Sequence, residues 1–378
     1  METTRRSVAT CLRVFPPPLS DGRRYLRRGA APMRQTAEAM LGGAGLGWPC
    51  GTRKRRNKKM KKIGLEEHFI IPELVPHLED TYQNINKSLA SRAVPRLQQL
   101  GDERIAIMDE AGLDFAVLSI AGPGVQIEPD AGKATAYARK ANDVLAEAMQ
   151  KYPKRYGGLA HLAMQDPAEA ARELERSVKD LKMQGAMING QTLGLYLDNP
   201  CYDEFWSVAA ALKAPVYLHP GNPVQMPITY EGAKALYGPF WGWMAETGSH
   251  VLRMVVNGVF DRHPDARMIL GHMGETLPFL MWRFDSRLPT AYMNVELQHE
   301  PTYYIRKNIT CTTSGVCDDV ALRCALDNLG EDNVMFSADY PFESLKAACD
   351  WVDAADIGAE RLEKVTHRNA ETILLGLK

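Results

Sequence analysis

The sequence of 378 residues lacks several features that would define its class at once. Its seven cysteines are scattered without a Cys-x-x-Cys pair, which excludes a disulfide scaffold and a cysteine-rich zinc module and favours a reducing compartment. No run of about 18 apolar residues occurs, so no transmembrane helix is expected. Neither a P-loop nor a Gly-x-Gly-x-x-Gly fingerprint after the first predicted strand is present, which disfavours a dinucleotide-binding fold.

Acidic residues are almost missing from the first sixty residues. Residues 1–62 hold 16 Lys and Arg against 3 Asp and Glu, so an acidic body carries a basic tail although the net charge is only −1. No apolar periodicity persists over 1–59, which predicts a disordered basic extension. Three interpretations remain open for this extension: a transit peptide, a basic nuclear-localisation or nucleic-acid-binding patch, or an upstream extension without function, with translation starting at Met60. No aromatic residue interleaves the basic run 53–62, so nucleic-acid binding is not expected.

What the body does have is a regular alternation of short apolar runs and amphipathic segments. Asp166, Pro167 and Glu169 give one helix start, and Gly112 gives one helix end. Strands are predicted at 62–69, 115–121, 156–164, 185–189, 214–219, 267–271, 308–313 and 333–338. Helices are predicted at 102–112, 131–152, from 166, and at 202–213, 250–260, 277–288, 318–329, 344–354 and 361–375. Eight such units predict an α/β fold, a (β/α)₈ TIM-type barrel in one domain, 60–378; a doubly wound open sheet is the alternative.

Ligand-type residues stand at the ends of four predicted strands. In such barrels the chemistry lies at the carboxyl ends of the strands, so these side chains should share one mouth. Glu66 and His68 lie two residues apart and therefore point to the same side, whereas Glu67 points to the helix layer or solvent. The residues gathered in this way are Glu66, His68, His219, His272, Glu275 and Asp339.

Two imidazoles and two carboxylates, without a thiolate, make a plausible divalent metal site. Mixed nitrogen and oxygen ligands suit Mn²⁺, Zn²⁺ or Mg²⁺, and no motif for an organic cofactor is needed. The predicted ligands are Glu66, His68, His219 and Asp339. Five further histidines are expected to be structural, namely His77, His250, His263, His299 and His367. His161 lies within a predicted strand and is the one further histidine that could face the interior.

Several motifs of the body resemble the amidohydrolase superfamily, and within it the metal-dependent non-oxidative decarboxylases. The resemblance covers about 60–378 and is nearest to the γ-resorcylate and 2,3-dihydroxybenzoate enzymes. Its markers are Leu-Glu-Glu-His-Phe at 65–69, Tyr-Leu-His-Pro at 217–220, Leu-Gly-His-Met-Gly-Glu at 270–275 and Phe-Ser-Ala-Asp-Tyr-Pro-Phe at 336–342. Having both Glu66 and His68 favours the γ-resorcylate side.

The resemblance implies roles for particular residues. It implies that Asp339, His272 and Glu275 are catalytic, and that Phe342, Asn189 and Arg283 serve the substrate, with Arg283 as a buried charge behind the site. The implied reaction is decarboxylation of an ortho-hydroxylated aromatic carboxylic acid, with one divalent metal ion per subunit. A metal-dependent hydrolase, a lactonase or amidase of the same superfamily, is the alternative.

The sequence also allows predictions about the pocket wall, the partners and the location of the protein. The aromatic-rich loop 220–246 leaves the fifth predicted strand at the mouth, so it forms either a wall and lid for the substrate or a subunit interface. We expect a small aromatic carboxylate as substrate, no membrane partner and a homo-oligomer, a dimer or a tetramer. The expected location is the cytoplasm, or the mitochondrion if 1–59 act as a transit peptide.

Overall fold

Eight parallel strands, paired in chain order, form the centre of the protein. A computed structural model describes residues 60–82, 87–291 and 295–376, and the predicted disordered extension lies outside them. Each strand pairs in parallel with the next one along the chain. The strands are β1 (Ile63–Phe69), β2 (Phe115–Ile120), β3 (Tyr156–His161), β4 (Gly185–Asn189), β5 (Val216–His219), β6 (Met268–Leu270), β7 (Ile309–Thr312) and β8 (Val334–Met335).

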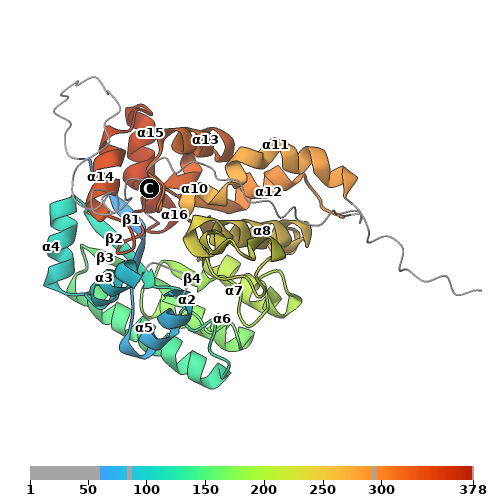
Figure 1. Ribbon diagram of the computed structural model, residues 1–378. Coiled ribbons are helices and arrows are strands. Elements are labelled where there is room, and N and C mark those ends of the chain that lie inside the picture. Colours follow the sequence, from blue (N-terminus) through green and yellow to red (C-terminus); the bar gives the residue numbers. More distant parts are fainter. Residues whose placement is uncertain (1–59, 83–86, 292–294, 377–378) are drawn as a thin grey trace, which may run out of the picture. The chain divides into compact units, whose positions relative to one another are not determined.

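Helices connect the strands and surround them (Figure 1). They are α2 (Val75–Tyr82), α3 (Lys87–Leu97), α4 (Asp102–Ala111), α5 (Ala131–Lys151), α6 (Pro167–Lys179), α7 (Asp203–Leu212), α8 (Gly242–Val256), α9 (Val259–Arg262), α10 (His272–Glu275), α11 (Leu277–Arg287), α12 (Pro301–Asn308), α13 (Asp319–Leu329), α14 (Leu345–Ala354), α15 (Ala359–Glu363) and α16 (Asn369–Ile373). This alternation, with the strands paired in chain order, confirms the predicted (β/α)₈ barrel and excludes the alternative, a doubly wound open sheet.

Hydrogen bonds between β1 and the segment after β8 bring the two ends of the sheet together. The amide of His68 donates to the carbonyl of Tyr340 at 2.8 Å, and the amide of Glu66 donates to Ser337 Oγ at 2.7 Å. The barrel is therefore nearly closed, and the carboxyl ends of β1 and β8 lie next to each other.

Two of the local helix signals have the structure that the sequence predicts. The carboxylate of Asp166 accepts a hydrogen bond from the amide of Glu169 at 3.1 Å, which caps α6 with Pro167 in its first turn. Gly112 ends α4 with φ 82°, a left-handed conformation that glycine adopts without a steric penalty.

Other helix boundaries differ from the predicted ones. Helices α2 and α3 between β1 and β2 were not predicted; in α3, Pro95 lies inside the helix, where proline is normally disfavoured. The helix predicted at 250–260 is instead α8, which begins at Gly242 and ends at Val256, and Gly258 with φ 67° separates it from α9. Part of the expected loop 220–246 is therefore helical.

A bulge in β1 decides which of its residues face the barrel interior. The pairing of β1 with β2 shifts register between Gly64 and Glu67, so β1 holds one more residue there than β2. Leu65 can consequently pack in the small core inside the barrel, while the next residue, Glu66, also points inward. Glu67 then faces the helix layer, which confirms one of the two orientations predicted for it.

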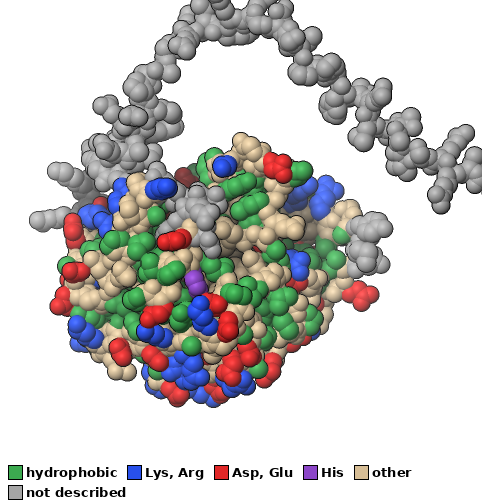
Figure 2. Space-filling view, turned by 60° about the horizontal axis from the view of Figure 1, so that its bottom comes forward, with side chains coloured by type: hydrophobic (Ala, Val, Ile, Leu, Met, Phe, Trp, Pro, Cys, Tyr) green, Lys and Arg blue, Asp and Glu red, His purple; other side chains and the backbone are tan. Residues whose placement is uncertain are grey.

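The surface of the described body mixes charges of both signs. On the face shown in Figure 2, basic and acidic side chains alternate with apolar ones, without a continuous basic area. Within the described ranges no helix is long and apolar enough to cross a membrane. The five cysteines among the described residues are all free.

Candidate metal centre and active site

Four side chains meet at the carboxyl end of the barrel strands. Glu66 and His68 come from the end of β1, His219 is the last residue of β5, and Asp339 follows β8. One possible ligand atom from each lies within 4.8 Å of the other three. The Nε2 atom of His219 is 3.3 Å from Glu66 Oε1, and His68 Nε2 is 3.3 Å from Asp339 Oδ1. The four predicted ligands are thus together in the structure.

The atoms of this cluster suit a divalent cation. Glu66 Oε1, His68 Nε2 and Asp339 Oδ1 are buried and have no hydrogen-bond partner among the described residues. Buried polar atoms are normally satisfied, so three orphans facing one another point to an absent ligand. His219 Nδ1 lies 2.9 Å from the carbonyl of Pro220. A carbonyl only accepts, so Nδ1 carries the hydrogen and the Nε2 lone pair faces the cluster.

Protonation favours the same conclusion. Burial lowers the pKa of His219 to about 4, with a smaller contribution from the neighbouring His68. At neutral pH the His219 ring is therefore uncharged and offers its lone pair. Two imidazole nitrogens with two carboxylate oxygens form a mixed donor set that holds Mn²⁺ or Zn²⁺ well.

A tyrosine that the sequence analysis missed orients the first ligand. The hydroxyl of Tyr217 donates to Glu66 Oε2 and lies 2.8 Å from Thr312 Oγ1. Burial and the charge of Glu66 raise the pKa of Tyr217 well above its usual value, so the hydroxyl stays protonated. A Cβ added at Gly271 would lie 2.6 Å from Glu66 Oε2, so glycine there leaves room for the carboxylate. Tyr217 lies two residues before His219 on the same face, which was the available signal.

His272 and Glu275 form a pair beside the cluster, as predicted. His272 Nδ1 is 2.8 Å from Glu275 Oε1, and its Nε2 is 3.8 Å from Asp339 Oδ2. Burial alone would lower the pKa of His272, but the charges of Glu275 and Glu66 outweigh it and raise that pKa well above its usual range. Burial likewise raises the pKa of Glu275, which His272 opposes. Glu275 therefore holds the His272 ring in place, and its charge favours the protonated form of that ring.

Asp339 keeps its negative charge in this setting. Burial by itself would raise its pKa, but the adjacent rings of His272 and His68 outweigh burial and lower it to about 2. Asp339 is therefore a carboxylate that can accept a proton and pass it on, rather than a group that is already protonated before the substrate binds.

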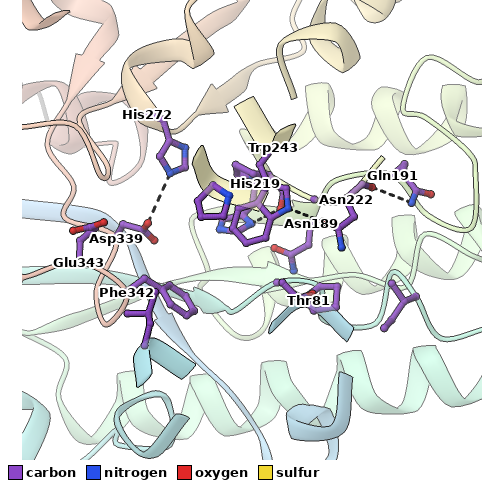
Figure 3. A pocket seen from close by; sticks show the side chains of 17 residues that line it. Thr81, Asn189, Gln191, His219, Asn222, Trp243, His272, Asp339, Phe342 and Glu343 are labelled. Carbon is purple, nitrogen blue, oxygen red and sulfur yellow. Dashed lines mark hydrogen bonds and ion pairs between the residues drawn. The ribbon is translucent and has the colours of Figure 1, made fainter. Parts of the chain in front are cut away.

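A pocket of about 240 Å³ opens over the cluster (Figure 3). A dry cavity of about 150 Å³ is enough for benzene, so this volume admits a substituted ring. The pocket is lined by Thr81, Leu89, Gly122, Pro123, Ile127, Asn189, Gln191, His219, Pro220, Gly221, Asn222, Pro239, Trp243, His272, Asp339, Phe342 and Glu343. Pro239 and Trp243 of the segment 220–246 contribute to this lining, as expected of a wall.

The three residues assigned to the substrate differ in their positions. Phe342 lines the pocket with its ring 5.6 Å from that of His68, and Asn189 lines it as well. Asn189 is 2% exposed, and neither atom of its amide has a hydrogen-bond partner among the described residues. Arg283 is exposed on α11 and does not line the pocket, so its prediction as a buried charge is wrong within one subunit.

Glu67 is also buried, behind the metal ligands. Its Oε1 accepts from the amide of Ala338 at 3.1 Å, so it links β1 to the segment that carries Asp339. Burial raises its pKa to about 7 against the opposing charge of Arg104. Arg104 is buried too and donates to the carbonyl of His68 at 2.6 Å. The helix layer therefore supports the cluster from outside, and Glu67 is not a surface residue.

The remaining histidines do not line the pocket. His161 is buried, and its Nε2 accepts from the amide of Val125 at 2.9 Å, which is a structural role. His250 accepts in the same way from the amide of Leu197 at 2.8 Å.

Comparison with known proteins agrees with the fold and identifies the family. The family model described as amidohydrolase matches residues 68–375, and the chain belongs to the amidohydrolase family. Among curated relatives, the γ-resorcylate decarboxylase of Rhodococcus jostii is 40% identical over 328 residues, which cover 82% of this chain and 98% of that protein. The resemblance inferred from the motifs is thereby confirmed.

Solved structures give the same relationship. A dihydroxybenzoic acid decarboxylase from Polaromonas, with bound manganese and the inhibitor 2-nitroresorcinol, has a TM-score of 0.78 at 38% identity over 83% of this chain and 96% of its own. A 5-carboxyvanillate decarboxylase from Novosphingobium aromaticivorans, complexed with manganese and 4-hydroxy-3-methoxy-5-nitrobenzoic acid, has a TM-score of 0.78 at 33% identity, covering 83% and 96%.

Proposed function

We propose that this protein is a carboxy-lyase that removes CO₂ from an ortho-hydroxylated benzoate without redox chemistry. The observation that carries the proposal is the set of unpartnered ligand atoms of Glu66, His68 and Asp339, next to a ring-sized pocket that Asp339 and His219 line. The relatives named above, which are decarboxylases of hydroxylated benzoates, support it. A divalent ion held by the four ligands would supply the positive charge that binds the carboxylate and an ortho oxygen together.

The residues of the chain divide the remaining work. Asp339, a carboxylate at neutral pH, takes the proton of the ortho hydroxyl and delivers it to the ring carbon that bears the carboxylate. The bond to the carboxylate carbon then breaks, its electron pair returns to the ring, and CO₂ leaves. His272, held by Glu275, donates a hydrogen bond to a substrate oxygen. Phe342 packs against the ring, and Asn189 offers its unpaired amide to a ring hydroxyl.

Manganese is the proposed metal, because both solved decarboxylase structures named above contain bound manganese. The test is CO₂ release from a panel of hydroxybenzoates by protein loaded with Mn²⁺, Zn²⁺ or Mg²⁺ and analysed for metal content. Lactones and amides run beside them, because the same donor set could instead serve a hydrolase. Ring opening of a lactone without CO₂ release from any benzoate would overturn the proposal.

We further propose that the protein is a homo-oligomer in the cytoplasm. Phe279 and Trp282 on α11 are 80% and 76% exposed, and large exposed apolar side chains side by side mark an interface. Arg283 belongs to the same helix, so its predicted contact with substrate would have to cross to a second subunit. Light scattering of the protein and of Trp282→Lys tests this, because loss of the apolar side chain should shift the mass toward the monomer.

A further inference from the structure

The pocket has a second polar end, remote from the metal ligands. In Figure 3 Asp339 and His272 lie at one end, Gln191 and Asn222 at the other, and His219 between them. Gln191 follows β4 and Asn222 follows β5, so both belong to the mouth of the barrel. The catalytic proposal uses neither of them.

A tryptophan fixes the orientation of the Asn222 amide. Trp243 Nε1 donates to Asn222 Oδ1 at 2.7 Å. An indole N–H is a donor only, so the amide oxygen must face Trp243 and the amide NH₂ must face away from it. Among the described residues nothing accepts a hydrogen bond from that NH₂. Asn222 lines the pocket, so a ligand can reach the group.

Gln191 is oriented in the same manner. The amide of Gly194 donates to Gln191 Oε1 at 2.6 Å, which directs the NH₂ to the other side. That NH₂ reaches the backbone carbonyl of Asn222 only at 3.5 Å. The far end therefore presents two uncharged N–H donors, whereas the charged lining residues, His272, Asp339 and Glu343, lie at the other end.

We propose that this donor pair selects substrates with a neutral acceptor oxygen on the ring edge remote from the carboxylate, at position 4 or 5. This inference rests on the proposed function and names its substrate class, a 2-hydroxybenzoate with a further hydroxyl or methoxy group. The cavity of about 240 Å³ has room for such a group beyond the ring. A second carboxylate is disfavoured, because no cationic side chain lines this end and a buried unpaired charge is costly.

The test replaces the donor and keeps the anchor. Asn222→Asp retains an oxygen for the Trp243 indole but turns the NH₂ into an oxygen, which repels an acceptor. For wild type and variant, kcat/KM is measured with 2-hydroxybenzoate, 2-hydroxy-4-methoxybenzoate and 2-hydroxy-5-methoxybenzoate, because a methoxy oxygen only accepts whereas a hydroxyl could also donate to the new carboxylate. For each substrate, kcat/KM is divided by the value for 2-hydroxybenzoate, and this ratio is compared between wild type and variant. The intrinsic reactivity of each ring then cancels. 2,6-Dihydroxybenzoate, whose second hydroxyl is not remote, and Asn199→Asp, outside the pocket, serve as controls.

The expected result is a ratio for the 4- or 5-methoxylated substrate that falls about tenfold in Asn222→Asp, as for the loss of one hydrogen bond with an added repulsion. The ratio for 2,6-dihydroxybenzoate and all ratios in Asn199→Asp should stay within about twofold. Equal ratios in wild type and Asn222→Asp would overturn the inference. Binding of the same benzoates, measured by calorimetry, gives the same comparison without turnover. If no CO₂ is released, the proposed reaction is refuted, but the ratios of the binding constants still test this inference.

Discussion

Replacing Glu66 by glutamine should remove the metal, although it changes only one atom. Tyr217 donates to this side chain, so the new amide oxygen should face Tyr217 and the NH₂ group should face the cluster. An NH₂ group cannot serve as a ligand, and the site also loses a negative charge. Loss of an outer partner of a ligand already costs about 10–100-fold in metal affinity, so loss of the ligand should cost more than about 100-fold.

Glu67 is the matched control, because it is adjacent and equally buried but faces the helix layer. Its pKa of about 7 means that the carboxyl is close to half protonated at neutral pH. Because burial raises its pKa above the usual 4.5, protonation of Glu67 contributes to the free energy of unfolding. This contribution is fully present below pH 4.5 and is lost as the pH rises through 7. Glutamine keeps the acceptor for Ala338 and does not ionise. Glu67→Gln should therefore cost about 1 kcal/mol or less at pH 8 and keep its metal.

The assay compares the two variants side by side for metal per subunit, thermal unfolding and CO₂ release. Glu66→Gln should be folded, metal-poor and inactive, whereas Glu67→Gln should keep metal and activity. If Glu67→Gln is the metal-free one while Glu66→Gln retains the ion, the inward face of β1 has been assigned wrongly and the metal centre with it.

Three further outcomes are expected. Asp339→Asn should stay folded by circular dichroism and lose about 10²–10⁴-fold in CO₂ release; more than about a tenth of the activity remaining would take it off the proton path. Burial lowers the pKa of His250 to about 3, so stability present above pH 6.5 is lost as the pH falls toward 3, by roughly 5 kcal/mol at most. His250→Gln keeps an acceptor for Leu197, and its urea midpoint should vary less between pH 6.5 and 4 than that of wild type. Deleting 1–59 should leave CO₂ release unchanged, since the described barrel begins beyond them; lower activity would show that they contribute.

The fold and the metal ligands were predictable because they depend on local periodicity. Alternation along β1 placed Glu66 and His68 on one side, and the barrel rule brought them to His219 and Asp339. The bulge between Gly64 and Glu67 was not visible in the sequence, yet Glu66 and His68 still lie together with His219 and Asp339 in the structure.

The features that the sequence did not predict depend on contacts between segments that are distant in the chain. Alternation turned Glu67 outward but could not say that α4 covers it with Arg104. The spacing of Tyr217 from His219 indicated its face, but its contact with Glu66, like that of Trp243 with Asn222, is not visible in the sequence. Arg283 lies on an exposed helix face, which a motif match cannot distinguish from a buried one.

In the proposed reaction, decarboxylation depends on a divalent ion held by Glu66, His68, His219 and Asp339. The most direct measurement is CO₂ release from 2,6-dihydroxybenzoate by protein stripped with a chelator, dialysed, analysed for residual metal and titrated with Mn²⁺. We expect only background release from the stripped protein and full recovery at about one Mn²⁺ per subunit, with no recovery in Glu66→Gln. Undiminished CO₂ release from protein that contains no metal would contradict it.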